Sequence, residues 1–244
     1  MAVRRKRSKK PILSLLLFLS VLVALYFFLH SSLFLIQKVF VSGNRVVSAN
    51  EILKLSGIRA GSNIFDMKGT AAAKAIMIIP RVKVAEVIRH LPNEVEITIT
   101  ERKPWAYVIH GSDLLVIDDE GVCIEKNMPL EKYDLPIITF EGTPARVKEG
   151  QRLNSKAVKT VRKLILALPR PIAAVISDYH CDAKGQVFFY TVDGTEVRFG
   201  GMERLPEKIR LLTNALNLKK PDGSEQPLRY VDLRYKGLPV IRYK

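Results

Sequence analysis

A cluster of basic residues followed by a long apolar run, close to the N-terminus, constrains this chain more than any other feature. Six lysine and arginine residues fall between positions 4 and 10, and the apolar run that follows extends from Ile12 to Leu29. At about 1.5 Å of rise per residue, a helix of this length crosses most of a hydrocarbon core about 30 Å thick. Because basic residues are costly to carry across a bilayer, we expect a cytoplasmic basic tail at 1–11 and an extracytoplasmic chain after the run.

A cleaved signal peptide has the same basic start and apolar middle. Here the apolar run exceeds the usual length of about 7–15 residues, and His30-Ser31-Ser32 follows it without an Ala-x-Ala cleavage site. No later segment is long and apolar enough to span a bilayer again. We therefore predict an uncleaved signal anchor at 12–34, a single-pass protein in the cell membrane, with its N-terminus cytoplasmic and its C-terminus extracytoplasmic.

The formal net charge is +15, which raises the question of whether the exported part binds a negatively charged partner. A basic surface suits nucleic acid, anionic lipid headgroups or cell-wall polymers, and it also occurs on proteins with no specific anionic ligand. Export from the cytoplasm disfavours nucleic acid. We expect contact with the lipid bilayer and none with nucleic acid.

The two cysteines, Cys123 and Cys181, lie far apart in the sequence, with no CxxC pattern and no clustered histidines. This spacing gives no support for zinc or thiol redox chemistry. Outside the cytoplasm a disulfide is permitted. We expect two buried free thiols, with a disulfide bridge as the alternative.

The first exported block, 35–102, shows the element order β-α-α-β-β. A strand that ends at Gly43-Asn44 precedes a short helix, for which Ser48 and Glu51 form a predicted capping box and Gly57 the stop. An alanine-rich second helix is expected to end at Pro80. Two strands follow, and the second of them alternates cleanly between apolar and polar residues.

The second block, 103–244, mixes hairpins with two amphipathic helices. Hairpins are predicted at 114–122 and around Asp193-Gly194, and helices at 155–168 and 205–216. Asn154 is the candidate N-cap of the first of these helices. The last predicted strands cover 230–235 and 238–243. We expect an α+β protein: one N-terminal transmembrane helix, a β-α-α-β-β domain, and a mostly antiparallel β-domain with helices on one side.

Short motifs in both blocks resemble the FtsQ/DivIB family of bacterial cell-division proteins, which carry an FtsQ-type POTRA domain. They are Val39-Phe40-Val41-Ser42-Gly43-Asn44, Glu51-Ile52, Gly57-Ile58, Gly61-Ser62-Asn63-Ile64, Pro80-Arg81-Val82, Pro92-Asn93, Thr100-Glu101-Arg102-Lys103-Pro104-Trp105-Ala106, Asp134-Leu135-Pro136 and Tyr230-Val231-Asp232-Leu233-Arg234-Tyr235. Each motif alone is weak, but together they occur in order and at the spacing of the family. The resemblance covers nearly the whole chain and implies a POTRA domain at 35–102 and an FtsQ/DivIB-type β-domain at 103–244.

Three short clusters contain residue types used in catalysis or metal binding: His110-Gly111-Ser112-Asp113, Asp118-Asp119-Glu120 and His180-Cys181-Asp182. The members of a catalytic triad meet through the fold, whereas adjacent residues in a turn do not. The acidic cluster lacks the regular ligand spacing of a calcium loop, and the third cluster has no second pair of ligands. We predict no catalytic residue, metal or cofactor.

The C-terminal segment is the candidate binding site. Pro239 has no amide donor, which favours a place for 238–243 at a sheet edge, and an open edge offers hydrogen bonds to an incoming strand. The resemblance implies that an FtsB-type partner adds a strand here. We expect Tyr235, Gly237, Val240 and Tyr243 to make the contact. The alternative is that Tyr235 packs in the core and Tyr243 merely caps the chain end.

The resemblance implies a scaffold of the bacterial divisome, enriched at the septum, that links and regulates division proteins. FtsB/DivIC-like and FtsL-like coiled-coil proteins are the expected partners, with other divisome components bound through the POTRA domain at a strand edge or at the Gly43-Asn44 turn. Arg81, Lys83 and Arg89 are expected to form a charged solvent-exposed face. A POTRA-bearing membrane assembly or secretion factor is the alternative function, and an exported wall enzyme is a third.

Overall fold

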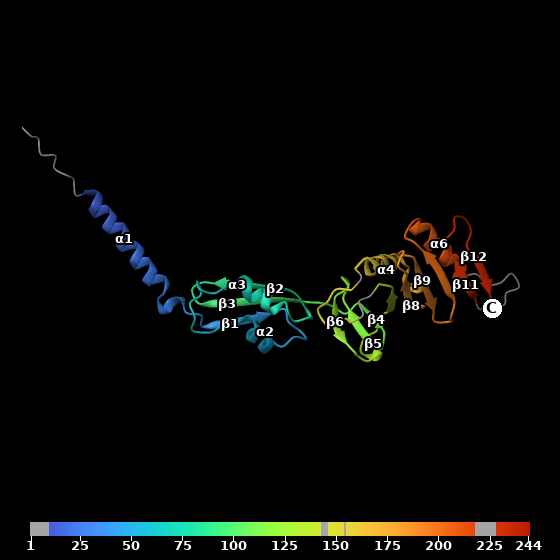
Figure 1. Ribbon diagram of the computed structural model, residues 1–244, viewed down its shortest axis with the longest axis horizontal. Helices are drawn as coiled ribbons and strands as arrows, with labels where there is room; N and C mark the ends of the chain where they lie inside the picture. The colour runs from blue at the N-terminus through green and yellow to red at the C-terminus, as the bar shows by residue number, and fades with distance from the viewer. Residues whose placement is uncertain (1–9, 143–145, 154, 218–227) are drawn as a thin grey trace, which may run out of the picture. The chain divides into compact units, whose positions relative to one another are not determined.

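The computed structural model describes residues 10–142, 146–153, 155–217 and 228–244 (Figure 1). The chain divides into two compact units: Met1–Ile78 with Val82–Glu101, and Ile79–Arg81 with Arg102–Lys244. The first helix, α1, runs from Lys10 to Leu29, and a separate short 3-10 turn follows at Ser32–Phe34. None of the helices in the described part of the chain has the length and apolarity that crossing a membrane requires.

The first unit contains a three-stranded sheet with two helices. Its strands are β1 (Lys38–Ser42), β2 (Val82–His90) and β3 (Glu94–Glu101), in the order β1-β3-β2. β3 pairs in parallel with β1 and antiparallel with β2. Its inward residues Val95, Ile97 and Ile99 are buried, as the alternation predicts. The helices are α2 (Ala49–Ser56) and α3 (Gly69–Ile76), so the predicted order β-α-α-β-β is confirmed.

Two local predictions for these helices are wrong in detail. Ser48 is the N-cap residue of α2, but its side chain makes no capping hydrogen bond. α3 ends at Ile76, four residues before Pro80. The backbone amide of the C-cap residue Met77 donates to the Ala73 carbonyl at the end of this helix. Gly57 does end α2, with a φ of 65° that a side-chain-bearing residue adopts only at a cost.

The second unit is built on one nine-stranded sheet with the order β12-β11-β10-β9-β8-β7-β4-β5-β6. The strands are β4 (Ala106–His110), β5 (Asp113–Ile117), β6 (Cys123–Lys126), β7 (Ile137–Phe140), β8 (Ile176–Cys181), β9 (Val187–Thr191), β10 (Glu196–Gly200), β11 (Leu228–Asp232) and β12 (Val240–Tyr243). Five of the eight neighbouring pairs are antiparallel, and the parallel ones are β4–β7, β7–β8 and β10–β11. Both predicted hairpins, β5–β6 and β9–β10, are confirmed.

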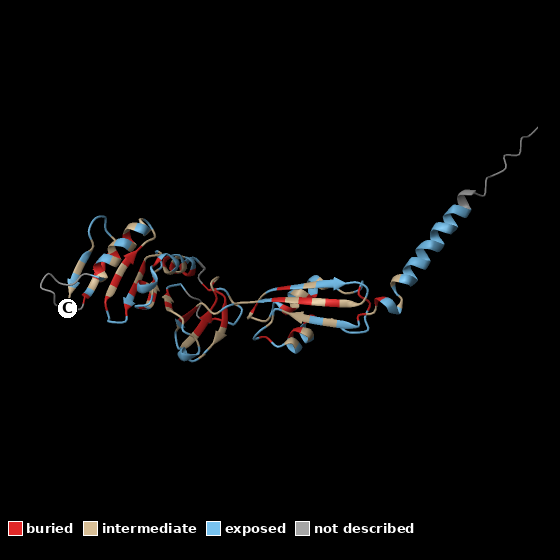
Figure 2. Ribbon diagram, turned by 180° about the vertical axis from the view of Figure 1, so that it is seen from behind, coloured by how far each residue is buried: buried red, intermediate tan, exposed pale blue. Residues whose placement is uncertain are grey.

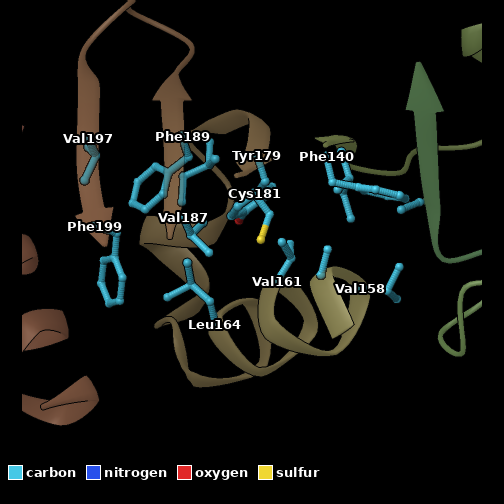
Figure 3. Close-up of a cluster of buried hydrophobic side chains, with 14 of the residues drawn as sticks. Phe140, Val158, Val161, Leu164, Tyr179, Cys181, Val187, Phe189, Val197 and Phe199 are labelled. Carbon is cyan, nitrogen blue, oxygen red and sulfur yellow. The ribbon is translucent and has the colours of Figure 1, made fainter. Parts of the chain in front are cut away.

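Helices cover the face of this sheet toward which the apolar residues point. They are α4 (Ser155–Ala167), α5 (Arg170–Ala173) and α6 (Leu205–Leu216), with a second 3-10 turn at Leu130–Lys132. Val158, Val161 and Leu164 of α4 belong to the same buried cluster as Cys181 and Val187 of the sheet (Figure 3). The proposed N-cap Asn154 lies outside the described residues. In Figure 2, buried positions follow the strands of both units, whereas the side chains along α1 are exposed.

Both cysteines are buried free thiols, as expected. Burial is the main reason why the pKa of Cys123 and of Cys181 rises to about 11. A thiol with such a pKa stays protonated near neutral pH and reacts slowly. These cysteines act as core residues.

Candidate functional site

One end of the nine-stranded sheet is open. The terminal strand β12 pairs antiparallel with β11, with Val231 opposite Ile241 and Asp232 opposite Val240. No strand among the described residues lies on the outer side of β12 (Figure 1). The placement of 238–243 at a sheet edge, inferred from Pro239, is therefore confirmed.

The other end of the sheet is covered by the chain itself. The edge strand β6 exchanges hydrogen bonds with the segment 149–152: the Cys123 amide donates to the Gln151 carbonyl at 2.9 Å, and the Gly150 amide donates to the Cys123 carbonyl at 2.7 Å. Farther along, the Lys126 amide donates to the Glu149 carboxylate at 3.1 Å. These contacts occupy the backbone groups that an incoming strand needs, so β12 is the better candidate for strand addition.

The four predicted site residues take different positions at this edge. Tyr235 is 66% exposed and Val240 is 51% exposed, whereas Tyr243 is half-buried and packs against the core together with Ile241. The alternative in which Tyr235 packs in the core is therefore wrong. Because successive side chains of a strand point to opposite faces, Val240 and Tyr243 lie on different sides of the sheet.

Gly237 allows the backbone of this loop to adopt a positive φ. Its φ is 104°, and no atom stands within 4 Å of the place that a Cβ would occupy. A side chain is therefore excluded by backbone strain and not by crowding. Leu238, which is 86% exposed beside Gly237, joins the predicted residues at this edge; its position between glycine and proline is the sequence signal that marks it.

Two arginines hold the loop that carries Tyr235. The guanidinium of Arg234 binds both carboxylate oxygens of Asp232, with Nη2 to Oδ2 at 2.6 Å, and lies 5.7 Å from the centre of the Tyr235 ring. Arg204, at the N-cap of α6, donates from Nη2 to the Tyr235 carbonyl at 2.9 Å. Nothing in the sequence pattern links Arg204 to this loop.

The buried Asp232 is the acidic centre of this region. Burial acts most strongly and would raise the pKa of Asp232, but the hydrogen bonds from Arg234 and the charges of Arg234 and Arg198 together lower it. The carboxylate therefore stays ionised at neutral pH. Exposed basic residues surround the edge: Arg229, Lys236, Arg242 and Lys244. Their charge favours an incoming strand with acidic residues.

The first unit offers a second edge. β2 is an outer strand of its sheet, and its Val84 and Ile88 side chains are 40% and 42% exposed. The Gly43-Asn44 turn, in contrast, is used within the fold. A Cβ on Gly43 would meet the Ile99 carbonyl oxygen at 2.1 Å, and the Asn44 amide donates to the Val47 carbonyl. The geometry favours the strand edge over the turn as a binding surface.

The residues of the family-like junction motif have internal partners. The carboxylate of Glu101 accepts hydrogen bonds from three successive amides of the first unit, those of Arg45, Val46 and Val47, at 2.8–2.9 Å. In the second unit, Arg102 forms an ion pair with Asp118. Such charge-assisted bonds fix a backbone turn in each unit.

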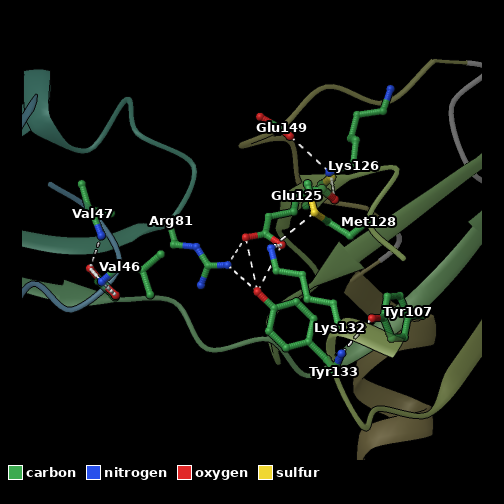
Figure 4. Close-up of polar contacts among 12 residues, drawn as sticks. Val46, Val47, Arg81, Tyr107, Glu125, Lys126, Met128, Lys132, Tyr133 and Glu149 are labelled. Carbon is green, nitrogen blue, oxygen red and sulfur yellow. Dashed lines mark hydrogen bonds and ion pairs between the residues drawn. The ribbon is translucent and has the colours of Figure 1, made fainter. Parts of the chain in front are cut away.

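Two basic residues predicted to lie on a solvent-exposed face are structural. Arg81 forms an ion pair with Glu125, and its Nη2 donates to the Tyr133 hydroxyl at 2.8 Å (Figure 4). Arg89 donates to the carbonyls of Ile64 and Met67. The prediction is wrong for Arg81, whose side chain is only 11% exposed because it binds acceptors from distant parts of its own unit. It is confirmed for Arg89, which is exposed although it binds these carbonyls.

The Arg81–Glu125 pair gives a testable pH dependence. Burial would raise the pKa of Glu125, but hydrogen bonds from Arg81 and Lys132 outweigh it and lower this pKa. The pair therefore stabilises the fold above about pH 4.3, and this contribution is lost as the pH falls through the lowered folded-state pKa. We expect Glu125→Gln to reduce the free energy of unfolding by about 2 kcal/mol at pH 7, between the values for exposed and buried pairs.

This difference is measured by urea unfolding of the full chain in detergent micelles. The fluorescence of Trp105, the single tryptophan, reports on the second unit because its side chain packs against that core. The difference between the two proteins should narrow below about pH 4, where the wild-type carboxylate takes up a proton. A difference that stays constant from pH 7 to pH 3 would contradict the assigned role of this charge.

The three clusters of catalytic residue types have structural roles. Gly111 and Ser112 form the turn between β4 and β5. Asp118 accepts hydrogen bonds from the amides of Glu120 and Val122, which closes the next turn. The Thr139 hydroxyl lies 2.9 Å from His180 Nδ1 on neighbouring strands. Within the described ranges no group of histidine, cysteine and carboxylate residues is arranged to hold a metal ion.

Comparisons with known proteins agree with this architecture. Residues 34–102 match the POTRA domain of FtsQ type, and residues 106–234 match the C-terminal domain of cell division protein FtsQ/DivIB. A cell division protein FtsQ from Chloroflexus aurantiacus is 30% identical over 222 residues, which cover 91% of this chain and 78% of the relative. A cell division protein DivIB from Clostridium botulinum strain Hall is 27% identical over 246 residues, covering 98% and 92%.

The match extends to a cell division protein FtsQ from Myxococcus fulvus, which is 30% identical over 178 residues that cover 70% of this chain and 61% of the relative. The match to the C-terminal domain extends over more than half of the chain. It assigns the chain to the same family as the likeness to the Chloroflexus protein does. The resemblance read from the short motifs is confirmed. The chain belongs to the FtsQ/DivIB family of bacterial cell division proteins.

Proposed function

We propose that this protein is a scaffold of the divisome that holds a partner protein by strand addition at β12. The observation that carries this proposal is the contrast between the two ends of the sheet, since β6 is covered by 149–152 and β12 is the outermost strand. An incoming strand gains main-chain hydrogen bonds at such an edge, and exposed side chains beside it give specificity. Tyr235, Leu238 and Val240 supply that apolar contact.

The partners proposed are bitopic coiled-coil division proteins of the FtsB/DivIC and FtsL types. The basic residues around the edge suit a partner strand that carries acidic side chains, because complementary charges raise association rates and suppress wrong partners. The edge of β2 is proposed as a separate contact for other divisome components. The role is one of recruitment and regulation without catalysis.

We propose further that the apolar segment 12–34 anchors the protein in the cell membrane, with the basic tail on the cytoplasmic side. The side chains from Leu13 to Phe28 are exposed and, apart from two serines and one alanine, are large and apolar. Apolar side chains exposed around the whole circumference of a helix suit a lipid environment. Extraction with alkaline carbonate tests this: an anchored protein stays with the membrane fraction, whereas release into the supernatant would contradict the anchor.

A Tyr235→Ala variant tests the binding site. The wild-type full chain in detergent micelles should bind the purified extracytoplasmic segment of its FtsB/DivIC-like partner. We expect the substitution to raise Kd by at least about tenfold, since truncating an exposed aromatic contact at the centre of an interface costs more than about 1.4 kcal/mol. Isothermal titration calorimetry measures both constants.

Tyr190→Ala is the matched control. Tyr190 is 43% exposed on β9, two strands away from β11 and three from β12, so its truncation should leave Kd unchanged. Equal weakening by both substitutions would contradict the assigned site and leave the scaffold role intact. Normal division in cells depleted of the protein would contradict the scaffold role itself.

A further inference from the structure

The end of α1 is tied to the first unit by specific contacts. The side-chain amide of Asn63 donates to the Leu29 carbonyl at 2.7 Å and so satisfies one of the carbonyls that a helix end leaves open. Asn63 is itself buried, and its Oδ1 accepts the Phe65 amide at 2.8 Å. The helix and the loop 58–67 are therefore held together by one side chain.

An aromatic cluster adds a second connection. Phe34 is buried, with its ring 5.3 Å from that of Phe28 on α1 and 5.1 Å from that of Phe65 in the loop. The backbone continues the contact, because the Ile64 amide donates to the Phe34 carbonyl and the Ile36 amide to the Ser62 carbonyl. This packing places the loop 58–67 beside the last turn of α1.

Three large apolar side chains are exposed at this same end of the unit. Leu33 is 49% exposed, Phe65 is 40% exposed and Leu91 is 60% exposed. Leu91 belongs to this end because the Gln37 amide donates to the Asn93 carbonyl, which sets the β2–β3 turn beside the start of β1. Because these exposed apolar side chains lie next to the end of an apolar helix, they extend the surface of the helix that is compatible with lipid.

Basic side chains lie near these exposed apolar side chains. Arg59 and Lys68 are exposed at the two ends of the loop, and Arg89 is exposed while it binds the carbonyls of Ile64 and Met67. Asp66 is the single acidic residue between positions 58 and 68. Clustered lysine and arginine beside apolar side chains suit a membrane surface with anionic headgroups.

We propose that this end of the first unit rests in the headgroup layer of an anionic bilayer, with Leu33, Phe65 and Leu91 as its apolar contacts. The inference rests on the proposed anchoring of α1 and adds a defined surface to it. The arguments are continuity with the exposed apolar surface of α1 and the basic charge of the loop. The opposite end of the unit, at the loop 43–47, faces away from the lipid.

Tryptophan fluorescence in the full chain reconstituted into liposomes tests the proposal. In a Trp105→Phe background, Phe65→Trp places the only tryptophan at the proposed surface. Val46→Trp is the matched control, because Val46 is 64% exposed in the loop that follows the far end of β1. Lipids brominated near the top of the acyl chains should quench the tryptophan at 65 at least about twofold more strongly than the one at 46, as expected for a side chain at the headgroup boundary.

The outcomes separate this inference from the anchor. A protein that fails to float with the liposomes would contradict the proposed anchor. Flotation with equal quenching at both positions, or with quenching at neither, would overturn the headgroup contact alone. Quenching at 65 should also fall when anionic lipid is replaced by phosphatidylcholine, and quenching that ignores this change would overturn the part of the proposal that depends on lipid charge.

Discussion

Phe189→Ala should reduce the free energy of unfolding of the second unit by about 3–5 kcal/mol, the usual cost of removing a fully buried aromatic ring. Phe189 is completely buried on β9, an interior strand of the nine-stranded sheet (Figure 3). Its ring lies 5.7 Å from that of Tyr179 and 6.2 Å from that of Phe199. Truncation leaves a cavity that these rings, fixed on neighbouring strands, cannot fill.

Urea unfolding of the full chain in micelles, followed by the fluorescence of Trp105, measures this loss. Phe188→Ala is the matched control, because Phe188 precedes Phe189 on β9 and points to the other face of the sheet, where it is half-buried. We expect the control to cost about 1 kcal/mol. Equal costs for the two variants would contradict the assignment of the core to one face.

Lys208→Met should reduce the free energy of unfolding by about 2–4 kcal/mol, because it leaves the Phe199 and Gly201 carbonyls in the interior without their donor. Lys208 is completely buried on α6, and its ammonium group donates three hydrogen bonds. The acceptors are the Phe199 carbonyl at 3.1 Å, the Gly201 carbonyl at 2.9 Å and the Glu203 carboxylate at 2.7 Å. Methionine keeps the length and apolar stem of lysine but satisfies none of these acceptors.

The same urea experiment measures this loss, with Lys163→Met as the control at an exposed position of α4. The hydrogen bond from Lys208 is the main reason why the pKa of Glu203 is lowered. Its stabilising effect is therefore present above the ordinary carboxyl pKa and is lost on acidification through the lowered one. Wild type should lose more stability than Lys208→Met between pH 6 and pH 3. A variant as stable as wild type would contradict the role of the buried lysine.

Residue patterns were sufficient to predict most elements of secondary structure. Alternation in 94–101 predicts one half-buried strand, and helical spacing in 205–216 predicts an amphipathic helix, because both patterns follow directly from backbone geometry. Asp193-Gly194 marks a hairpin for a similar local reason: Gly194 adopts a φ of 80°. The ends of elements were less predictable, as α3 shows by stopping before its proline.

The candidate site was predictable in place but not in detail. Pro239 indicates an edge strand because proline has no amide hydrogen to donate to a neighbouring strand. This property belongs to a single residue and can be read directly from the sequence. The exposure of Tyr235, in contrast, depends on Arg204 at the start of α6 and on Arg234, its neighbour in the loop, which hold this loop in place. The expectation of a solvent-exposed Arg81 is wrong for the same reason, since its partner Glu125 lies 44 positions away.

The element order, the buried faces of the strands and helices, the terminal edge strand and the family all follow from the amino-acid sequence alone. These features depend on periodicity, on single residues such as glycine and proline, and on short motifs. Two features come from the three-dimensional fold: the segment 149–152 covers β6 while β12 is the outermost strand, and Asn63 joins the end of α1 to the loop 58–67. Such contacts join residues that are far apart in the chain, and the local sequence around a residue does not specify which distant residue it will contact.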